Sequence, residues 1–197
     1  MPDNRRIWLL LLIAFAATAL AHLLDAWFYT NFRYDKVYEE DWGRALRVLG
    51  HLPVWLIAAL ALALHDRPTR GYRRAALIAE AATLGGLAAE ILKLILRRLR
   101  PYAADGDYVF RPFTERTFST SGLALPSSHA LIAFAAAAML ARLFPRARLV
   151  WWALAWGCGL TRVAAGAHFL SDIVVAAVAG WTVAAVLWHY FGKRQLA

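Results

Sequence analysis

The chain has 197 residues, of which 61% are hydrophobic, with nine tryptophans and a mean hydropathy of +0.48. This composition excludes an ordinary soluble domain and indicates an integral membrane protein. The formal charge of +9 does not favour a nucleic-acid partner, because polytopic membrane proteins gather Lys and Arg in cytoplasmic loops and against anionic headgroups.

Six uninterrupted apolar runs are each long enough to cross a bilayer as a helix, which takes roughly 20 residues. They are Ile7–Trp27, Val48–Leu64, Ala75–Leu96, Ser127–Phe144, Leu149–Ala167 and Ile173–Phe191. Because six crossings use about 120 residues, the remainder suffices only for connections. We therefore expect one all-α domain over residues 1–197, with both termini on the same side of the membrane.

The first run raises the question of a signal peptide. It contains Ala-Leu-Ala at residues 19–21, a small-residue pattern typical of a cleavage site. We expect a retained helix instead, because the apolar stretch continues past this site to Trp27 and Phe28, which suit an interfacial aromatic belt.

The connections between the runs differ in length and composition. Residues 31–47 place apolar side chains at helical spacing, which predicts an amphipathic segment lying on the membrane surface. Residues 97–126 form a long connection that carries five Tyr and Phe among its basic residues. Long loops in compact proteins are commonly functional, so we expect this one to contribute to the site.

A first polar cluster closes the third run. Lys93 and Arg100 are seven residues apart, so on a continuing helix they project from the same side. Pro101 is then expected to help end that helix. We interpret Arg97 and Arg98 as cations that reach lipid headgroups from the helix end. Lys93 lies a turn or more deeper, so headgroup contact explains it less well.

A second cluster, Pro-Ser-Ser-His at residues 126–129, opens the fourth run. A serine before a helical run commonly caps the helix. Free amide donors and the positive end of the helix dipole also make such a position an anion site. Capping leaves His129 unexplained, because it is an ionisable group at the start of an alanine-rich span.

A third cluster lies between the fifth and sixth runs and contains Arg162, His168 and Asp172. The spacing of four brings His168 and Asp172 together on one helical face or across a turn. A carboxylate bonded to one imidazole nitrogen fixes the tautomer and leaves the other nitrogen free to attack. Taken alone, such a pair is more often structural.

Together the clusters supply three cations, two histidines and one carboxylate at one membrane face, which headgroup contact does not explain. The cations imply an anionic ligand, and the two histidines imply a nucleophile and a proton donor acting on it. Lys and Arg number eleven on each side of the six-span topology, so their count alone gives no orientation. Lys93, Arg100 and Arg162 on the other face are explained by binding of an anionic ligand, so we leave them out of the count. The remaining Lys and Arg then favour the side of the termini as cytoplasmic.

The order Lys-x6-Arg-Pro, Pro-Ser-x-His and Arg-x5-His-x3-Asp resembles the three-part signature of the type 2 phosphatidic acid phosphatase superfamily, whose membrane members have six helices. The resemblance runs from Lys93 to Asp172. Ser128 stands where many members have Gly, and Thr161 where many have Ser. The resemblance implies a lipid phosphatase of the bacterial inner membrane, with its active site facing the periplasm or exterior.

Through this resemblance His168 is expected to be the nucleophile that forms a phosphohistidine, and Asp172 to orient it. His129 is expected to protonate the leaving group and then to activate water. The residues expected to hold the phosphoryl oxygens are Lys93, Arg100, Arg162, Ser127 and Ser128. Three cations can stabilise three equatorial oxygens without Mg²⁺, and the sequence has no dedicated cluster of metal ligands. We therefore predict turnover without a metal or other cofactor.

The resemblance implies a membrane lipid phosphate as substrate: phosphatidic acid, phosphatidylglycerol phosphate, a polyprenyl diphosphate or a lipid A phosphate. The sequence does not choose among these, and residues 97–126 are a candidate selector. One alternative is a phosphotransferase, in which a hydroxyl other than water captures the phosphohistidine. Another is a lipid transporter or binding protein, in which the intramembrane ions line a path.

Other polar residues fall inside the apolar runs. His22 and Asp25 lie in the first run and Glu90 in the third, and intramembrane acids are functional candidates by default. Because Glu90 is one turn before Lys93, an ion pair that positions the lysine explains it at least as well as substrate contact. Cys158 is the only cysteine, which excludes an intrachain disulfide and a cysteine-based metal site.

Overall fold

The computed structural model describes residues 4–66 and 68–192. Its elements in chain order are α1 (Asn4–Asn31), α2 (Asp41–Val48), α3 (Leu52–His65), α4 (Pro68–Leu96), η1 (Pro101–Ala103), α5 (Ser128–Leu143), η2 (Pro145–Ala147), α6 (Arg148–Ala164), α7 (Leu170–Leu187) and η3 (Trp188–Gly192). Within these two ranges the only β-structure is a pair of isolated bridges. The all-α prediction is confirmed for the described residues.

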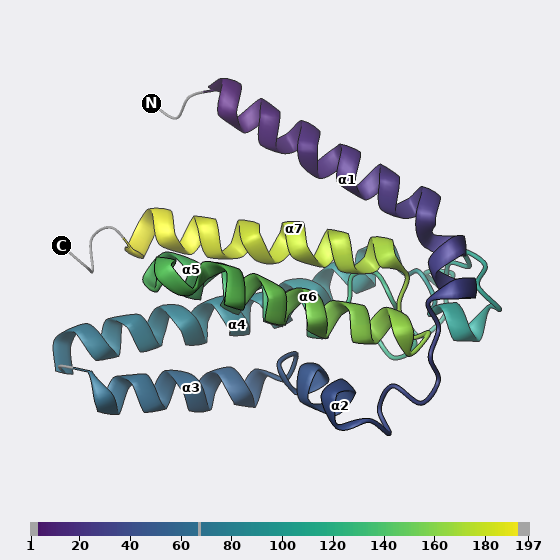
Figure 1. Cartoon of the computed structure of the whole chain (residues 1–197). Coiled ribbons are helices and arrows are strands. Elements are labelled where there is room, and N and C mark those ends of the chain that lie inside the picture. Colours follow the sequence, from purple (N-terminus) through teal and green to yellow (C-terminus); the bar gives the residue numbers. More distant parts are fainter. Residues whose placement is uncertain (1–3, 67, 193–197) are drawn as a thin grey trace.

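Helix α5 forms the centre of the bundle and packs against α4, α6 and α7 (Figure 1). Every side chain from Ala130 to Leu140 is buried. Most of them are alanines, whose small size lets neighbouring helices approach closely. A Cβ atom on Gly180 of α7 would lie 2.8 Å from the backbone nitrogen of Ala135. The α5–α7 crossing therefore requires glycine at this point.

Three described helices are long and apolar enough to cross a membrane: Arg5–Asn31, Gly71–Leu96 and Leu170–Gly192. Helices α2 and α3, bent by 69° relative to each other, make a fourth if they count as one broken span. Helices α5 and α6 are shorter, with 16 and 17 residues. By length and composition the described residues thus supply three to four spans, and the count of six stays a prediction.

Helix α1 meets the bundle at its C-terminal end and diverges from it toward its N-terminal end (Figure 1). Its large apolar side chains face outward, with Phe15 72% and Leu23 81% exposed. An apolar surface of this extent suits contact with lipid. The beginning of α1 and the end of α7 lie at the same end of the molecule.

Helix α2 is the amphipathic segment predicted between the first two apolar runs. It packs along α6, where a Cβ on Gly157 would lie 2.8 Å from the Leu46 side chain. On its exposed side Arg44 pairs with Asp41 at 2.5 Å. This packing holds the preceding residue Tyr38 against the C-terminal end of α6, where the Tyr38 hydroxyl donates to a backbone carbonyl.

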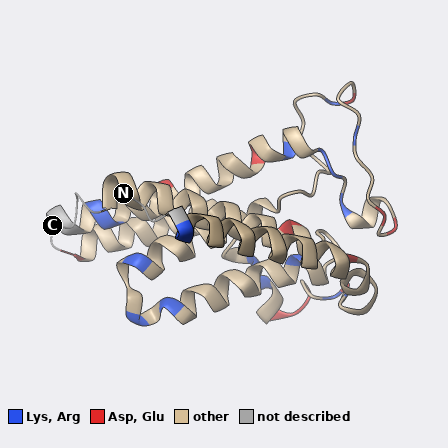
Figure 2. Ribbon diagram, turned by 90° about the horizontal axis from the view of Figure 1, so that it is seen from above, with Lys and Arg blue, Asp and Glu red and all other residues tan. Residues whose placement is uncertain are grey.

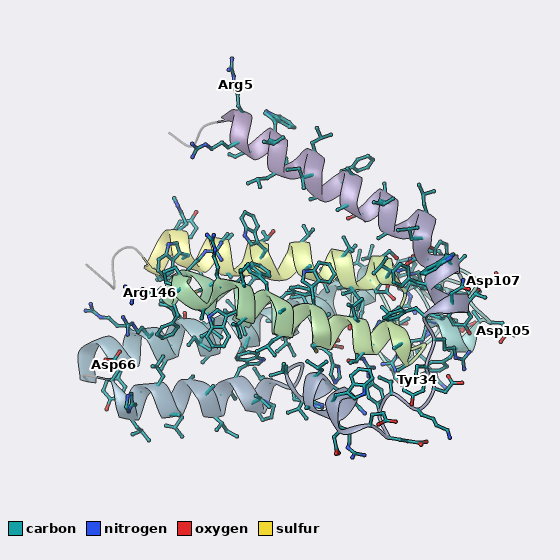
Figure 3. All side chains as sticks on the ribbon, in the orientation of Figure 1. Arg5, Tyr34, Asp66, Asp105, Asp107 and Arg146 are labelled. Atoms are coloured by element: carbon teal, nitrogen blue, oxygen red, sulfur yellow. The ribbon has the colours of Figure 1, made fainter. Side chains whose placement is uncertain are left out.

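Charged side chains concentrate toward the two ends of the helices (Figure 2). Arg5, Asp66 and Arg146 mark the end at which α1 begins, and Asp105 and Asp107 mark the opposite end (Figure 3). At that opposite end α4 runs into the long connection of residues 97–126 and α5 and α7 begin. The three predicted polar clusters therefore fall at one end of the bundle.

Candidate active site

Helix α4 ends at Leu96, five residues before Pro101, and Arg97 then adopts a left-handed backbone conformation with φ 53°. Lys93 is therefore helical, whereas Arg100 lies in an extended segment that follows the helix. The prediction that both project from one side of a continuing helix was wrong. The two cations nevertheless lie within electrostatic range of each other and of Arg162.

The interpretation of Arg97 and Arg98 as cations that contact lipid headgroups was wrong, because each side chain is only 1% exposed. Arg97 donates to four backbone carbonyls of the long connection, at 2.5 to 3.2 Å. Arg98 instead extends toward the beginning of α7, where it forms a buried ion pair with Asp172. The two arginines are buried because the chain after α4 folds back over the end of the bundle instead of leaving it.

Lys93 is held at the N-terminus of α5. Its Nζ lies 3.0 Å from Oε1 of Glu90, so the expected ion pair is present, and it also donates to Oγ of Ser128. The Ser128 hydroxyl donates to the same carboxylate oxygen at 2.7 Å. Ser127 caps α5, since its Oγ accepts from the backbone nitrogen of Ala130 at 3.4 Å. Both serines thus have a structural contact in addition to their expected role.

The two departures from the family signature differ in what they contact. The Ser128 hydroxyl joins α4 to α5 through Glu90 and Lys93, which a glycine cannot do. The Thr161 hydroxyl donates at 2.8 Å to the carbonyl of Cys158 within its own helix. Only the first departure changes the contacts between helices.

Arg162 is 5% exposed and lies near the C-terminal end of α6. Its Nη1 donates to the Tyr38 hydroxyl at 2.7 Å, and its guanidinium carbon lies 5.6 Å from the centre of that ring. Sequence reasoning missed Tyr38, which no motif distinguishes. The guanidinium is within electrostatic range of Arg100 and of His168.

His168 lies in the turn between α6 and α7 and is 3% exposed. Its Nδ1 is 3.5 Å from Oδ2 of Asp172, and this nitrogen has no hydrogen-bond partner among the described residues. Asp172 is itself fixed, because Oδ2 accepts from the backbone nitrogen of Phe169 at 2.8 Å and Oδ1 accepts from Arg98. Burial lowers the pKa of His168 to about 4 despite the neighbouring carboxylate. The imidazole is therefore neutral at pH 7.

His129, in the first turn of α5, lies within electrostatic range of Arg162 and His168. Its ring packs edge-on against His51 with centroids 4.7 Å apart. Its Nε2 is buried without a hydrogen-bond partner among the described residues, and so are Nε of Arg100 and Nε of Arg162. Buried polar atoms in folded proteins are nearly always paired. A group of unpaired nitrogens in one place indicates a site for a ligand rich in acceptors.

We call this group the cationic site. Its members are Lys93, Arg100, Arg162, His129, His168, Asp172, Ser127 and Ser128. A backbone hydrogen bond of 3.4 Å from Ser127 to Asp172 joins the beginnings of α5 and α7, and one of 3.1 Å from Ala167 to Arg162 turns the chain after α6. The described residues contain no group of three or more His, Cys, Asp or Glu that could hold a metal ion.

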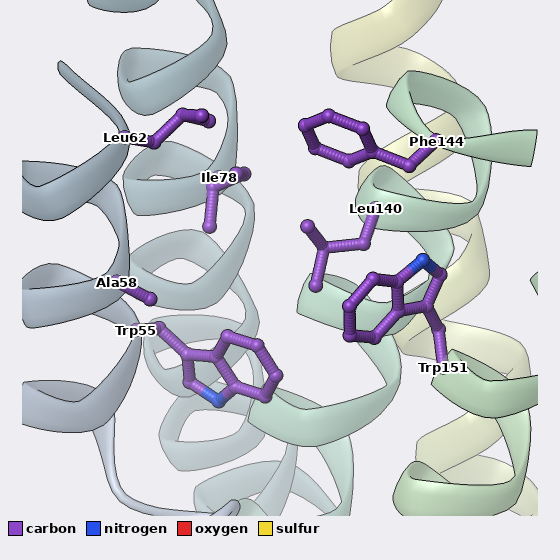
Figure 4. A pocket seen from close by; sticks show the side chains of 7 residues that line it. All are labelled: Trp55, Ala58, Leu62, Ile78, Leu140, Phe144 and Trp151. Carbon is purple, nitrogen blue, oxygen red and sulfur yellow. The ribbon is translucent and has the colours of Figure 1, made fainter. Parts of the chain in front are cut away.

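A cavity of about 320 Å³ lies at the other end of the bundle (Figure 4). It is lined by Trp55, Ile78, Leu140, Trp151 and three further apolar residues, and none of these lining residues is charged. Its chemistry does not suit a phosphate, so the cationic site is the better candidate.

Comparisons with known proteins identify the family. The PAP2 superfamily matches residues 74–196. The lipid A 1-phosphatases of Rhizobium etli and Rhizobium johnstonii are 38% identical over 99 residues and 37% identical over 97 residues. These matches cover 49% and 48% of this chain but only 41% and 38% of the two relatives. The chain thus spans less than half the length of the curated relatives it matches.

A solved structure extends the likeness to the whole fold. The transmembrane PAP2-type phosphatidylglycerolphosphate phosphatase of Bacillus subtilis matches with a TM-score of 0.63 at 18% identity, over 93% of this chain and 94% of that one. The family match covers more than half of the chain and contains the whole interval from Lys93 to Asp172. This chain belongs to the PAP2 superfamily.

Proposed function

We propose that this chain is a membrane lipid phosphatase that hydrolyses a phosphate monoester or diphosphate of a lipid through a phosphohistidine at His168. The observation that carries the proposal is the cationic site, in which cations with unpaired nitrogens surround a buried, neutral imidazole. A carboxylate behind that imidazole suits a nucleophile better than an ion path.

His168 attacks the phosphorus atom. Because Nδ1 is the nitrogen nearest to Asp172, Nε2 is the nitrogen that forms the bond to phosphorus. As this bond forms, the bond from phosphorus to the lipid oxygen breaks. The neutral state of His168 supplies the lone pair that the attack needs.

His129 carries the proton. It donates the proton from Nε2 to the departing lipid oxygen, which leaves as an alcohol or as the shortened phosphate. The resulting neutral imidazole then takes a proton from water, whose oxygen attacks the phosphohistidine. The nitrogen–phosphorus bond breaks, inorganic phosphate is released, and both histidines return to their starting states.

The cations hold the non-bridging oxygens throughout. Lys93 has two contacts, with Glu90 and Ser128, so one of its three N–H groups is left for a phosphoryl oxygen. Arg100 and Arg162 contribute guanidinium donors, and the first backbone amides of α5 add an anion-binding helix N-terminus. Stabilising charge on three equatorial oxygens is the main demand of phosphoryl transfer.

An apolar groove supports a lipid as the substrate. It has a volume of about 850 Å³ and lies between the first half of α1 and helices α6 and α7. Its lining begins at Val174, two residues beyond Asp172, and includes Trp156 and Ala17. From there the groove runs toward the end where α1 begins, so an acyl chain that enters it at Val174 leaves its headgroup beside the cationic site and within the membrane.

The proposal includes the placement of the protein. Six spans in the cell inner membrane put both termini in the cytoplasm and the cationic site at the periplasmic or outer face. Lipid A is the first substrate to test, because the two relatives named above are lipid A 1-phosphatases.

The test is a phosphate-release panel in detergent, with a chelator present and no added acceptor. The substrates are lipid A, phosphatidic acid, phosphatidylglycerol phosphate and a polyprenyl diphosphate, each also given to the His168→Ala variant. We expect at least one lipid to release phosphate and the variant to release none. Loss of the lipid's phosphate only when a hydroxyl acceptor is added, with the phosphate recovered on that acceptor, identifies a phosphotransferase instead. Release from a soluble phosphoester but from no lipid overturns the lipid assignment.

A further inference from the structure

A buried carboxylate on α1 is connected to the far side of the cationic site. Asp25 is 2% exposed and lies in the part of the chain that precedes the matched residues 74–196. Its oxygens accept three hydrogen bonds. Ser171 donates from its backbone nitrogen at 2.8 Å and from its hydroxyl at 2.5 Å, and Tyr108 donates from its hydroxyl at 2.6 Å.

The connection continues from Ser171 through Arg98 to Asp172. Nη2 of Arg98 donates to the Ser171 hydroxyl oxygen at 2.8 Å and also to Oδ1 of Asp172. The other oxygen of Asp172 is the one that faces His168. Buried hydrogen bonds therefore join Asp25 to Asp172, and Asp172 in turn lies 3.5 Å from the imidazole of the proposed nucleophile.

Arg98 has little freedom to take another position. Its guanidinium packs against the rings of Tyr108 and Phe169, with centroids at 5.0 and 4.9 Å, and these two rings also contact each other. Its Nη1 lies 3.4 Å from Nε2 of His22. Burial, reinforced by the Asp25 carboxylate, raises the pKa of Tyr108 far above its usual range. Tyr108 therefore remains a hydrogen-bond donor to Asp25 at any physiological pH.

Asp25 controls the direction in which the Ser171 hydroxyl proton points. A hydroxyl has one proton to donate. Because Asp25 offers only acceptors, the proton points toward it, and the lone pairs of Ser171 remain for Arg98. Arg98 can only donate, so the Ser171 oxygen accepts from it, and the Asp25 carboxylate is the acceptor that keeps the Ser171 proton out of that contact.

We propose that Asp25 is a positioning residue: by directing the Ser171 hydroxyl it sets Arg98, and through Arg98 it sets the carboxylate that orients His168. Among the described residues, the hydrogen bonds of Asp25 go to Ser171 and Tyr108 and to no cation of the cationic site. The inference rests on the proposed function for its catalytic consequence, whereas the orientation of the imidazole is a property of the protein alone.

The substitution Asp25→Asn tests the mechanism with little change of shape. In one orientation its amide NH₂ takes the place of Oδ2, so it faces the hydroxyls of Ser171 and Tyr108 as a donor and the Ser171 proton loses its acceptor. In the other orientation its amide faces the Ser171 backbone N–H, and again two donors meet. Either arrangement removes a bond that fixes Ser171, and Ser171 is the residue that holds Arg98 against Asp172.

The matched control is Thr18→Val on the same helix, because the hydrogen bond of the Thr18 hydroxyl within the described residues goes to the carbonyl of Ala14, one turn earlier in α1. We expect Asp25→Asn to lower kcat roughly 10–100-fold, the usual cost of losing an orienting partner, with KM nearly unchanged. Thr18→Val keeps both constants. Unchanged kcat in a folded Asp25→Asn protein overturns the proposal. If Asp25→Asn does not fold, Tyr108→Phe, which removes one of the three bonds, takes its place with a smaller fall in kcat.

A second readout does not depend on phosphatase activity. In protein labelled with ¹⁵N-histidine, the His168 signals are identified by their absence from His168→Gln. We expect the tautomer with the proton on Nδ1 in the wild type and in Thr18→Val, and a loss of that preference in Asp25→Asn. If the wild type hydrolyses no lipid, the proposed function fails, and this spectrum alone decides on Asp25: an unchanged tautomer overturns its role.

Discussion

Two sets of cations at the same end of the bundle differ in how their nitrogens are used. Arg97 and Arg111 direct theirs at backbone carbonyls: Arg97 makes four such bonds, and Arg111 makes two, at 3.0 and 2.5 Å. In the cationic site, Nε of Arg100 and Nε of Arg162 have no partner among the described residues. Burial of positive charge therefore does not by itself mark function here. What separates these two cations from Arg97 and Arg111 is an Nε without a protein partner. Nε of Arg98 is unpaired as well, but that guanidinium is neutralised by Asp172.

The difference has an energetic meaning. Carbonyl dipoles replace the water that Arg97 loses, so its charge stabilises the path of residues 97–126. The cations of the cationic site repel one another, and a bound phosphate relieves that repulsion. Substitutions in the first set should therefore lower stability, and substitutions in the second should lower activity.

The largest expected effect comes from Arg162→Met. Losing one preorganised donor to a developing charge costs roughly 10²–10³ in rate, so kcat/KM should fall by that factor. The melting temperature in detergent should stay the same or rise, because a repulsive charge is removed from a buried position. Phosphate release and thermal unfolding, measured on the same preparation, check this. A melting temperature that falls with the activity would place Arg162 in the structural set.

Arg97→Met should do the opposite. Its four carbonyls lose their shared donor, and a hydrogen bond to a charged group contributes about 1.5–3 kcal/mol, so we expect a loss of about 3 kcal/mol after partial rehydration. The melting temperature should fall clearly, while the fraction that remains folded keeps a near-normal KM. A stable protein with no activity would show that Arg97 acts at the site, and the distinction between the two sets would fail.

The helices and the three motif pieces could be predicted from the sequence because they depend on local patterns. Apolar runs indicated the helices, helical spacing indicated α2, and a separation of one turn indicated the Glu90–Lys93 pair. Arg98 was misread because its partner depends on the left-handed turn at Arg97, where no glycine signals a change of direction. A helix that continued to Pro101 would have pointed Arg98 elsewhere.

Two other contacts, those of Tyr38 and Asp25, could not be predicted from the sequence for a different reason. Tyr38 meets Arg162 across 124 positions and Asp25 meets Ser171 across 146. No periodicity or spacing connects residues so far apart, and a single sequence carries no other record of contact. The sequence marked Asp25 as an acid inside the first apolar run, but it did not indicate Ser171 as the partner. Only the packing of α1 and α2 against α6 and α7 reveals both pairs.

Vanadate should separate the two sets in one experiment, because it mimics the five-coordinate state of the phosphoryl group. At a concentration about 100 times its Kd a ligand stabilises the folded state by about 2.7 kcal/mol. We expect vanadate to raise the melting temperature of the wild type and of Arg97→Met by similar amounts. It should not raise that of Arg162→Met. Equal shifts in all three proteins would mean that vanadate binds outside the cationic site.

The smallest expected effect is that of Ser128→Gly. Ser128 belongs to the cationic site, but its hydroxyl already has protein partners, as the nitrogens of Arg97 and Arg111 do. Its hydroxyl bonds to Glu90 and Lys93, but the helix cap is Ser127, and the backbone amide of residue 128 survives the substitution. Losing the net value of one hydrogen bond should lower kcat by about threefold, since Lys93 keeps its contact with Glu90 at 3.0 Å. The measurement is phosphate release beside a melting curve, with Thr18→Val as the control. A fall as large as that of Arg162→Met would mean that the hydroxyl itself holds a phosphoryl oxygen. The phosphate donors of the cationic site would then include side chains that already have protein partners. Donor groups without a protein partner would no longer distinguish the two sets.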